Sequence, residues 1–557
     1  MGQTRTCRIT GAEFHVGDDE IRFLERVSPR LGDETHAIPP PDICPEERQR
    51  RRLAFRNLRN LHHRKSDLSG RALISMYEPD SLHTVFHNEE WWSDAWDPFA
   101  YGRDFDFSRP FFQQLAELYR EVPTLHQYVI LSENCEYVNG AANCKDCYLS
   151  FNMDYCEQCY YIHTGIHCRS CVDCYSITQC ELCYSCVDCD TCYNLTHSQR
   201  STRCSDSHFL ADCRRCKNCI ACVNLVDKEY YVFNQPCSKK EFEEHREMLR
   251  SKNRIARLQE QFAEHLQKFP RRYYYGDSNE DFSGEDIRHT RNCYSCYNSR
   301  DIENCRYCNY VFKAKNCMDY NIFGDNSEWM YQCLAAGINC TSDLFCMGCW
   351  GGSSFNMYCI TVSASSHCFA CVGLKQKQHC IFNKQYTPEA YTVTAGKIIS
   401  HMRRSGEWGE FFPPAMSPFS FNRTIAFDEY PLEKGTALSY GYTWQDADQK
   451  LAANNEIEIP DTMEVAHEDI CSKVLRCEKT GLPYKIVPQE YAFHKRHRIP
   501  LPAIAPEQRY RRNLSVRNPR VLFARQCADC GSALETSFSE IKCKAVLCEE
   551  CYRRNVY

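Results

Sequence analysis

The 557-residue sequence lacks any apolar run approaching the eighteen or so residues needed to cross a membrane. Its first residues lack the apolar segment of a secretion signal. A net charge of −6 is small for this length, so the composition predicts no general attraction to nucleic acid. The Gly-rich phosphate loop, the serine nucleophile elbow and the HExxH motif are also missing. These absences predict a non-enzymatic protein that does not associate with membranes, in the reducing environment of the cytoplasm.

What the sequence does contain is cysteine, with 41 residues. Over residues 135–237, cysteine recurs at a fixed interval of twelve, and a second track lies three residues behind the first. A fixed short interval predicts stacked repeats, each forming one structural unit. Twelve residues suit one narrow coil of a β-solenoid, with two short extended faces joined by tight turns. The first track consists of Cys144, Cys156, Cys168, Cys180, Cys192, Cys204 and Cys216, and the second includes Cys135, Cys147, Cys159, Cys171 and Cys183.

Three interpretations of these cysteine ladders stay open. A narrow coil has room inside only for small side chains, and cysteine behaves as a small buried hydrophobe, so the thiols could form the core. Pairs of the CxxC type could instead hold metal ions or clusters, although ladders place sulfurs in lines whereas a zinc site needs four converging ligands. Disulfide bonds are the third interpretation, and a reducing compartment disfavours them.

The sequence therefore predicts a mainly β fold, a cysteine-lined β-solenoid of about 12-residue repeats in two halves, flanked by small α+β domains of treble-clef or zinc-ribbon type. The second half is marked by Cys293, Cys305 and Cys317. The predicted order is a degenerate zinc-ribbon-like domain (1–90), an aromatic helical cap (91–130), solenoid half 1 (131–237), a charged helix (238–269), solenoid half 2 (270–386), a helix (387–405), an irregular arm (406–465) and a zinc-binding treble-clef-like domain (466–557).

Residues 91–130 are rich in aromatic and acidic side chains. We expect them to cap the exposed end of the solenoid by packing on its first coil. A sugar or metal site built on Asp94, Asp97, Asp104 and Asp106 is the alternative.

The two ends of the chain resemble each other, with Cys7–Gly11 repeated as Cys477–Gly481. In the C-terminal copy, two CxxC pairs separated by seventeen residues predict a structural zinc site, because two such knuckles bring four thiolates into a tetrahedron. In the N-terminal copy two serines, a histidine and a glutamate take these places, so we expect that copy to fold without zinc. A second site using Cys471, Cys477 and Cys543 stays open. The predicted ligands are Cys527, Cys530, Cys548 and Cys551, and their N-terminal counterparts are Ser66, Ser69, His87 and Glu90.

Both copies carry an arginine-rich segment before the first CxxC position. Such basic islands can contact phosphates, or the arginines can pair with carboxylates within the protein. The working hypothesis is a zinc-binding scaffold that binds nucleic acid, RNA more than DNA, or a ribonucleoprotein. The alternatives are a protein-interaction scaffold using the solenoid surface and a metal- or redox-handling protein using the ladders. The predicted contacts are Arg48, Arg51, Arg52, Arg56, Arg59, Arg64, Arg509, Arg512, Arg517, Arg520 and Arg525.

Several motifs together resemble those of uncharacterised cysteine-rich proteins from candidate-phylum bacteria, which have treble-clef or zinc-ribbon-like terminal domains. These motifs are Trp91–Asp94, Asp104–Phe112, Phe382–Lys384 and the terminal run Cys548–Tyr552. The resemblance implies zinc at the C-terminus and leaves the activity open.

Overall fold

The computed structural model describes residues 2–315, 347–446 and 457–556, together with 318, 321, 327–328, 331–334 and 344–345. The chain forms two compact units. Unit 1 contains Met1–Gln127, Tyr274–Asp446 and Arg520–Leu522, and unit 2 contains Tyr128–Tyr273, Ala447–Pro519 and Phe523–Tyr557. The N-terminal domain therefore belongs with solenoid half 2, and the C-terminal domain with solenoid half 1. The predicted repeat position Cys317 lies outside the described residues.

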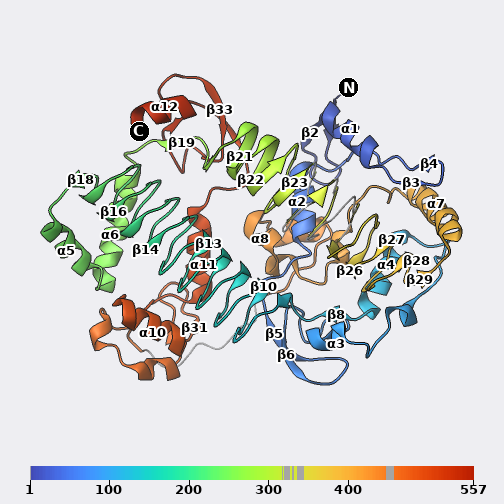
Figure 1. The fold of residues 1–557 in the computed structure, drawn as a ribbon, viewed down its shortest axis with the longest axis horizontal. Helices are drawn as coiled ribbons and strands as arrows, with labels where there is room; N and C mark the ends of the chain where they lie inside the picture. Colours follow the sequence, from blue (N-terminus) through green and yellow to red (C-terminus); the bar gives the residue numbers. More distant parts are fainter. Residues whose placement is uncertain are drawn as a thin grey trace. The chain divides into compact units, whose positions relative to one another are not determined.

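The predicted fold class is confirmed, because both units are built on a parallel β-solenoid. In unit 2, Phe151 pairs with His163 and His163 with Tyr175, so equivalent strands are twelve residues apart. Figure 1 shows these short strands stacked side by side. The strands are β9 (Val129–Ile130), β10 (Asn139–Ala142), β11 (Phe151–Asp154), β12 (His163–Ile166), β13 (Tyr175–Thr178), β14 (Tyr193–Thr196), β15 (Ser205–His208), β16 (Lys217–Ile220), β17 (Glu229–Val232) and β18 (Gln235–Pro236).

Each coil has four sides of three residues, so the expectation of two extended faces is wrong. In the tripeptide Lys145–Cys147, Lys145 bridges to the neighbouring coils, Asp146 turns the chain with φ +53°, and Cys147 points inward with 2% exposure. A left-handed residue recurs at nearly every third position of the solenoid. Asn and Asp tolerate this conformation better than most residues, which explains their frequency at the corners. Four such corners close one coil of twelve residues.

The interior geometry explains why cysteine and serine fill the core. In each tripeptide, the first two amides bond to neighbouring coils, as Lys145 N–H does to the Cys156 carbonyl (2.9 Å) and Asp146 N–H to the Glu133 carbonyl (3.0 Å). The third amide points inward. Cys186 N–H donates to Cys174 Sγ (3.4 Å), and Ile162 N–H donates to Ser150 Oγ (3.0 Å). The Cys186 thiol in turn donates to the Leu195 carbonyl (3.4 Å). Cysteine and serine suit this interior because they are small and both accept and donate hydrogen bonds, although Ile162, Ile177 and Leu195 also fill inward positions.

Solenoid half 1 ends in an antiparallel pair, β17–β18, followed by two helices where the sequence predicted one. These are α5 (Lys239–Met248) and α6 (Lys252–Leu266). Ser238 caps α5 by accepting the Glu241 amide, and Thr387 caps α7 (Pro388–Arg404) in the same way after half 2.

Solenoid half 2, in unit 1, is less regular. From Asn321 to Leu334, Met347 and Ile360, successive coils pair at an interval of thirteen residues, and later coils return to twelve. Its strands are β20 (Gly276–Asp277), β21 (Glu280–Arg288), β22 (Arg291–Glu303), β23 (Phe312–Lys315), β24 (Ser327–Glu328), β25 (Met347–Trp350), β26 (Ile360–Ser363), β27 (Ser366–Phe369), β28 (Gln378–Ile381) and β29 (Lys384–Gln385).

The sequence predicts that the aromatic segment packs on the first coil of the solenoid; the structure instead places this segment against half 2. Phe111, the first residue of α4 (Phe111–Glu121), packs edge-on against Tyr358 and Phe382 and tilted against Phe369. The Lys375 ammonium lies 4.3 Å from the ring centre of Trp91. Among the four aspartates of the alternative site, Asp104 forms an ion pair with Lys384 (2.7 Å). The segment thus covers the late coils of the second half.

The terminal domains consist of short hairpins and helices. In unit 1 these are β1 (Gln3–Thr6), β2 (Glu13–Val16), α1 (Asp18–Val27), β3 (Arg30–Leu31), β4 (Glu34–Thr35), α2 (Pro45–Leu53), β5 (His62–Lys65), β6 (Ala72–Ser75), β7 (Val85–Phe86), α3 (Asn88–Trp92) and β8 (Thr124–Leu125). The arm of unit 1 adds α8 (Ile425–Glu429) and α9 (Lys434–Ser439). In unit 2 they are β19 (Arg271–Arg272), β30 (Leu475–Arg476), β31 (Pro483–Tyr484), α10 (Pro488–His497), α11 (Pro506–Val516), β32 (Phe523–Gln526), β33 (Ala533–Thr536), β34 (Val546–Leu547) and α12 (Glu549–Val556).

Candidate metal centre

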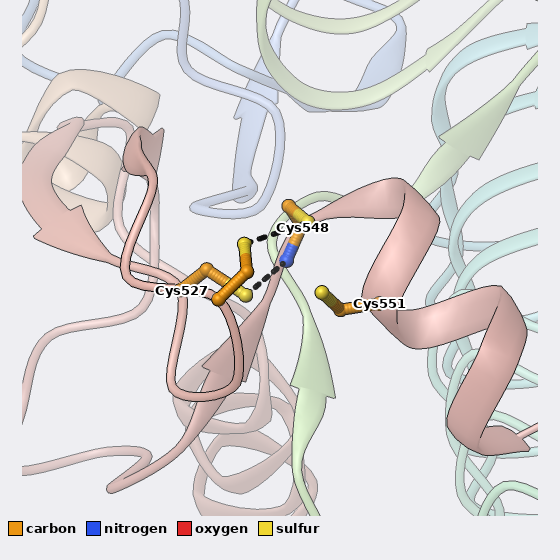
Figure 2. Close-up of side chains that lie close together, drawn as sticks. Cys527, Cys548 and Cys551 are labelled. Atoms are coloured by element: carbon orange, nitrogen blue, oxygen red, sulfur yellow. Dashed lines mark hydrogen bonds between the residues drawn. The ribbon is translucent and has the colours of Figure 1, made fainter.

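The four predicted cysteine ligands converge near the C-terminus. The Sγ atoms of Cys527, Cys530, Cys548 and Cys551 all lie within 4.8 Å of one another. The Cys530 and Cys548 sulfurs are 3.8 Å apart, which is about the spacing of two thiolates bound to one tetrahedral zinc ion at about 2.3 Å. Figure 2 shows Cys527, Cys548 and Cys551 directed toward one another. The donor set fits a metal that prefers tetrahedral sulfur coordination.

Two backbone turns place these sulfurs. After Cys527, the Gly531 amide donates to the Cys527 carbonyl (2.9 Å), and Gly531 adopts φ +74°, a conformation that glycine adopts without strain. The turn lies at the tip of the β32–β33 hairpin. Cys548 stands directly before α12, and Cys551 lies in the first turn of this helix. The Cys548 amide donates to Cys527 Sγ (3.3 Å), which joins the two turns.

The surroundings favour thiolates at the first turn. Although burial opposes it, the backbone amides of Cys530, Cys548 and Asp529 lower the pKa of Cys527 to about 6. The Ser532 hydroxyl, 3.1 Å away, lowers the pKa of Cys530. Arg554 reaches both Asp529 (2.5 Å) and the sulfur of Cys551 (3.6 Å), so a positive charge lies beside the cluster. Deprotonated sulfur is the form that binds metal.

The metal centre is connected to solenoid half 1. β34, which leads into Cys548, pairs in parallel with β19, which follows the helices that close this half. The Tyr552 hydroxyl of α12 donates to Asn224 Oδ1 (3.0 Å), on one of the last coils. A metal at the four cysteines would therefore fix the end of the C-terminal domain against the end of the half-1 solenoid.

The turn-and-helix module that carries these ligands occurs four times, twice in each terminal domain. Module A contains β1, β2 and α2; module B contains β5, β6, β7 and α3; module C contains β30, β31 and α11; module D contains β32, β33, β34 and α12. In every module, the backbone amide of the residue that follows the first ligand position donates to a backbone carbonyl. That carbonyl belongs to the residue two positions before the third ligand position. These pairs are Arg8–Asp42 (2.9 Å), Asp67–Val85 (3.0 Å), Glu478–Ala503 (3.0 Å) and Ala528–Val546 (2.9 Å).

Only module D has a complete ligand set among the described residues. The four ligand positions hold Cys7, Thr10, Cys44 and Glu47 in module A, Ser66, Ser69, His87 and Glu90 in module B, and Cys477, Thr480, Ala505 and Gln508 in module C. Comparison of the two ends of the sequence aligned modules A and B with modules C and D. It did not detect that A resembles B and that C resembles D. The recurring glycine after the second position, at Gly11, Gly70, Gly481 and Gly531, was the available signal.

In module B, hydrogen bonds join the positions that a metal would join in module D. The Glu90 carboxylate accepts from the Ser66 and Ser69 hydroxyls, one at each oxygen. It also accepts the His87 backbone amide (3.1 Å). Burial acts against ionisation, but these hydroxyls outweigh it and lower the pKa of Glu90. One carboxylate thus links both turns of this module.

The cysteines outside module D do not form a second four-ligand group within the described residues. Cys477 Sγ accepts the Ala505 amide (3.3 Å), and Cys543 Sγ donates to the Ala545 carbonyl (3.1 Å). The described interior cysteines form no disulfides. Burial raises the pKa of the interior Cys174 and Cys186 thiols, while hydrogen bonds from neighbouring thiols lower the pKa of Cys171 and Cys180. The hydrogen bonds of the interior thiols to backbone carbonyls favour the first interpretation of the ladders, a core of packed thiols.

In unit 1, the arginines of α2 lie against the solenoid and its arm. Arg52 Nε donates to Asn321 Oδ1 (2.6 Å), beside Gln49, which accepts from the amides of Asn309 (2.8 Å) and Asn321 (2.7 Å). Arg51 pairs with Glu410 (3.0 Å). Arg48, Arg51 and Arg52 are buried, while Arg56, Arg59 and Arg64 are half-buried.

In unit 2, the arginines around the equivalent helix, α11, pair with corners of solenoid half 1. Arg509 contacts Asp173 (2.8 Å), Arg512 donates to Ser185 (2.8 Å), and Arg517 contacts Asp188 (3.2 Å). Arg525 donates to the carbonyls of Cys543 and Lys544, both at 2.8 Å. In unit 1, Arg520 pairs with Glu429 (2.9 Å). None of the eleven predicted arginines is fully exposed, so nucleic-acid binding through them stays a prediction that their burial does not favour.

Comparisons with known proteins assign no family. No family model and no curated protein matches the sequence. A crystal structure described as a proposed acetyltransferase from Desulfovibrio desulfuricans G20 aligns with 39% of this chain and 63% of its own, at 9% identity and a TM-score of 0.10. The chain thus spans less than two thirds of that structure, and the likeness carries no argument. No helix among the described residues is long and apolar enough to cross a membrane.

Proposed function

We propose that this protein is a non-enzymatic, zinc-stabilised scaffold whose solenoid surface binds a protein partner. The observation that carries the proposal is the way α10 and α11 cover two of the four sides of half 1. Phe493 of α10 packs with Val172 and Tyr184, and Tyr510 of α11 packs with Tyr175 and Val187. The arginines of α11 pair with the solenoid and so help to hold the helix on it, and for this reason they are less available for phosphates.

A third side of half 1 carries a ladder of alternating charge. Successive coils place Glu133, Lys145, Glu157, Arg169 and Glu181 at equivalent positions, and most of these side chains are exposed. Lys145 lies 3.9 Å from Glu133, and Arg169 lies 3.7 Å from Glu157. Such exposed pairs contribute little to stability. Because three of its five residues are acidic, the ladder suits a protein surface of mixed charge better than the phosphate backbone of RNA.

The experiment compares cross-linked partners of the full-length protein with those of the Lys145→Glu, Arg169→Glu variant. We expect a protein partner that is captured by the natural chain and lost from the variant, while thermal stability and metal content stay equal. RNA affinity measured over a range of salt concentrations provides the second readout. Tight RNA binding with a steep salt dependence, abolished by Arg512→Gln and Arg517→Gln, would favour the nucleic-acid hypothesis and overturn this proposal.

A further inference from the structure

Unit 1 contains a pocket of about 720 Å³ between its N-terminal domain and the segment that follows α7. One wall is formed by residues 37–43 and by Arg48 and Arg51 of α2. The other wall is formed by Arg403 and by residues 408–411. The volume falls in the range typical of small-molecule sites. We call this cavity the arginine pocket.

Positive charge exceeds negative charge in the arginine pocket. Arg5, Arg48, Arg51 and Arg403 line it, against Asp42 and Glu410. Both carboxylates are already engaged, because Asp42 pairs with Arg8 (2.8 Å) and Glu410 pairs with Arg8 and Arg51 (both 3.0 Å). These pairs leave no carboxylate in the lining for the guanidinium groups of Arg5 and Arg403.

Three of the four guanidinium groups, those of Arg5, Arg48 and Arg51, are also held in place, whereas Arg403 is exposed. Arg5 Nη1 donates to the carbonyls of Pro40 (2.8 Å) and Pro41 (3.1 Å), and Arg48 Nη1 donates to that of Ile43 (2.9 Å). Arg51 is 7% exposed, and its Nη1 donates to Glu410 (3.0 Å), which fixes this guanidinium in the wall. Fixed guanidinium groups are suited to carboxylates and phosphates.

The rest of the pocket wall is apolar. Pro39, Pro40 and Trp408 contribute to it, and Trp408 is fixed by a hydrogen bond from its indole N–H to the Ala37 carbonyl (2.9 Å). Gly409 has φ +89°, and a Cβ there would lie 2.9 Å from Cδ of Pro39. Glycine thus allows the two walls to approach closely beside the arginines. An occupant with both an anionic group and an apolar body would contact both parts of the wall.

We propose that the arginine pocket binds a small organic anion, a phosphate or carboxylate group attached to an apolar body. The anionic group lies among the guanidinium groups of Arg5, Arg51 and Arg403, and the apolar body lies against the prolines and Trp408. This inference is independent of the scaffold function, because the pocket belongs to unit 1 and the charge ladder to unit 2.

The test uses phenyl phosphate and benzoate as probes in isothermal titration calorimetry with the full-length protein. We expect at least one probe to bind with a one-to-one stoichiometry, and phenol, which lacks the anionic charge, not to bind. The two anionic probes distinguish a phosphate site from a carboxylate site. Arg403→Gln should weaken binding about tenfold or more, because one charge-assisted hydrogen bond is lost.

Arg404→Gln is the matched control, because Arg404 is the next residue of the same helix, is exposed like Arg403, and does not line the pocket. It should leave the affinity unchanged, and both variants should keep the natural melting temperature. Arg5→Gln provides a second variant, again with weaker binding expected. The proposal is overturned if neither anionic probe binds, if phenol binds equally well, or if Arg403→Gln and Arg404→Gln behave alike.

Discussion

The Nη1 atom of Arg509 lies 2.8 Å from Asp173 Oδ2 and 2.6 Å from Glu490 Oε1, and all three side chains are almost completely buried. Burial, together with Glu490, raises the pKa of Asp173 to about 6, although Arg509 opposes this shift. The ion group joins a coil corner, α10 and α11 at one point. Charges that look suited to solvent or phosphate in the sequence are thus part of the interior of unit 2.

Replacing Arg509 should destabilise unit 2 strongly. Arg509→Met leaves Asp173 and Glu490 buried without their shared cation, and removing one partner of a buried ion group costs about 3–5 kcal/mol. Chemical denaturation followed by circular dichroism measures the loss. Arg511→Met on the same helix is the control. Its guanidinium is exposed and pairs only with Glu507 along the helix, so a change within about 0.5 kcal/mol is expected.

The number of metal ions bound per chain should depend on the four cysteines of module D alone. We expect about one zinc ion per chain, lost in Cys548→Ser, because a site with three thiolates binds zinc more weakly. Cys543→Ser is the matched control, since Cys543 is buried in the same module but donates its thiol to a backbone carbonyl. Metal analysis after gel filtration is the measurement. Four or more metals per chain, unaffected by Cys548→Ser, would show that the ladders are ligands.

The carboxylate bridge of module B should contribute measurably to stability. Glu90→Gln removes charge from an acceptor of three hydrogen bonds, and we expect a loss of about 1–3 kcal/mol in the free energy of unfolding. Glu89→Gln, at an exposed neighbouring position, should leave the stability almost unchanged. Equal effects of the two substitutions would show that the bridge is not important.

The interior hydrogen bonds predict that serine can replace cysteine where alanine cannot. Cys174→Ser keeps an acceptor for the Cys186 amide and should cost less than about 1 kcal/mol. Cys174→Ala removes it and leaves a buried donor unpaired, with an added cost of about 1–3 kcal/mol. Denaturant unfolding under reducing conditions measures both. If the serine variant were the less stable of the two, apolar packing and not hydrogen bonding would explain the cysteine core.

Buried histidines should make unit 2 sensitive to acid. Burial lowers the pKa of His208 and of His494 to about 4, below the ordinary value of about 6.5. Between these values the unfolded chain binds protons that the folded chain does not, so stability present above pH 6.5 should fall as the pH drops toward 4. For each histidine, the slope is at most about 1.4 kcal/mol per pH unit. His208→Gln, compared with the natural chain between pH 7 and 4, should show a shallower loss.

Local spacing predicted the solenoid and the four-cysteine group, because both depend on intervals within a short stretch of chain. The four-sided coil was also readable in principle, since Cys183, Cys186, Cys189 and Cys192 mark four successive inward positions. The partners of the arginines could not be predicted from the sequence. Asp173, Ser185 and Asp188 are brought to α11 only by coiling, more than 300 residues away in sequence. Sequence alone cannot distinguish an arginine that faces water from one that faces a distant carboxylate.

Because each side of a coil contains three residues, the regular solenoid can change its length only by certain numbers of residues. Twelve added or deleted residues keep every corner, every inward thiol and every ladder on its own side. Three residues would keep thiols inside but shift all later ladders by a quarter of a coil, and one residue would turn thiols outward. The thirteen-residue intervals from Asn321 to Leu334, Met347 and Ile360 show that the less regular half 2 also accommodates single added residues. In the regular coils of half 1, insertions that survive should cluster in multiples of three residues, with whole coils preferred.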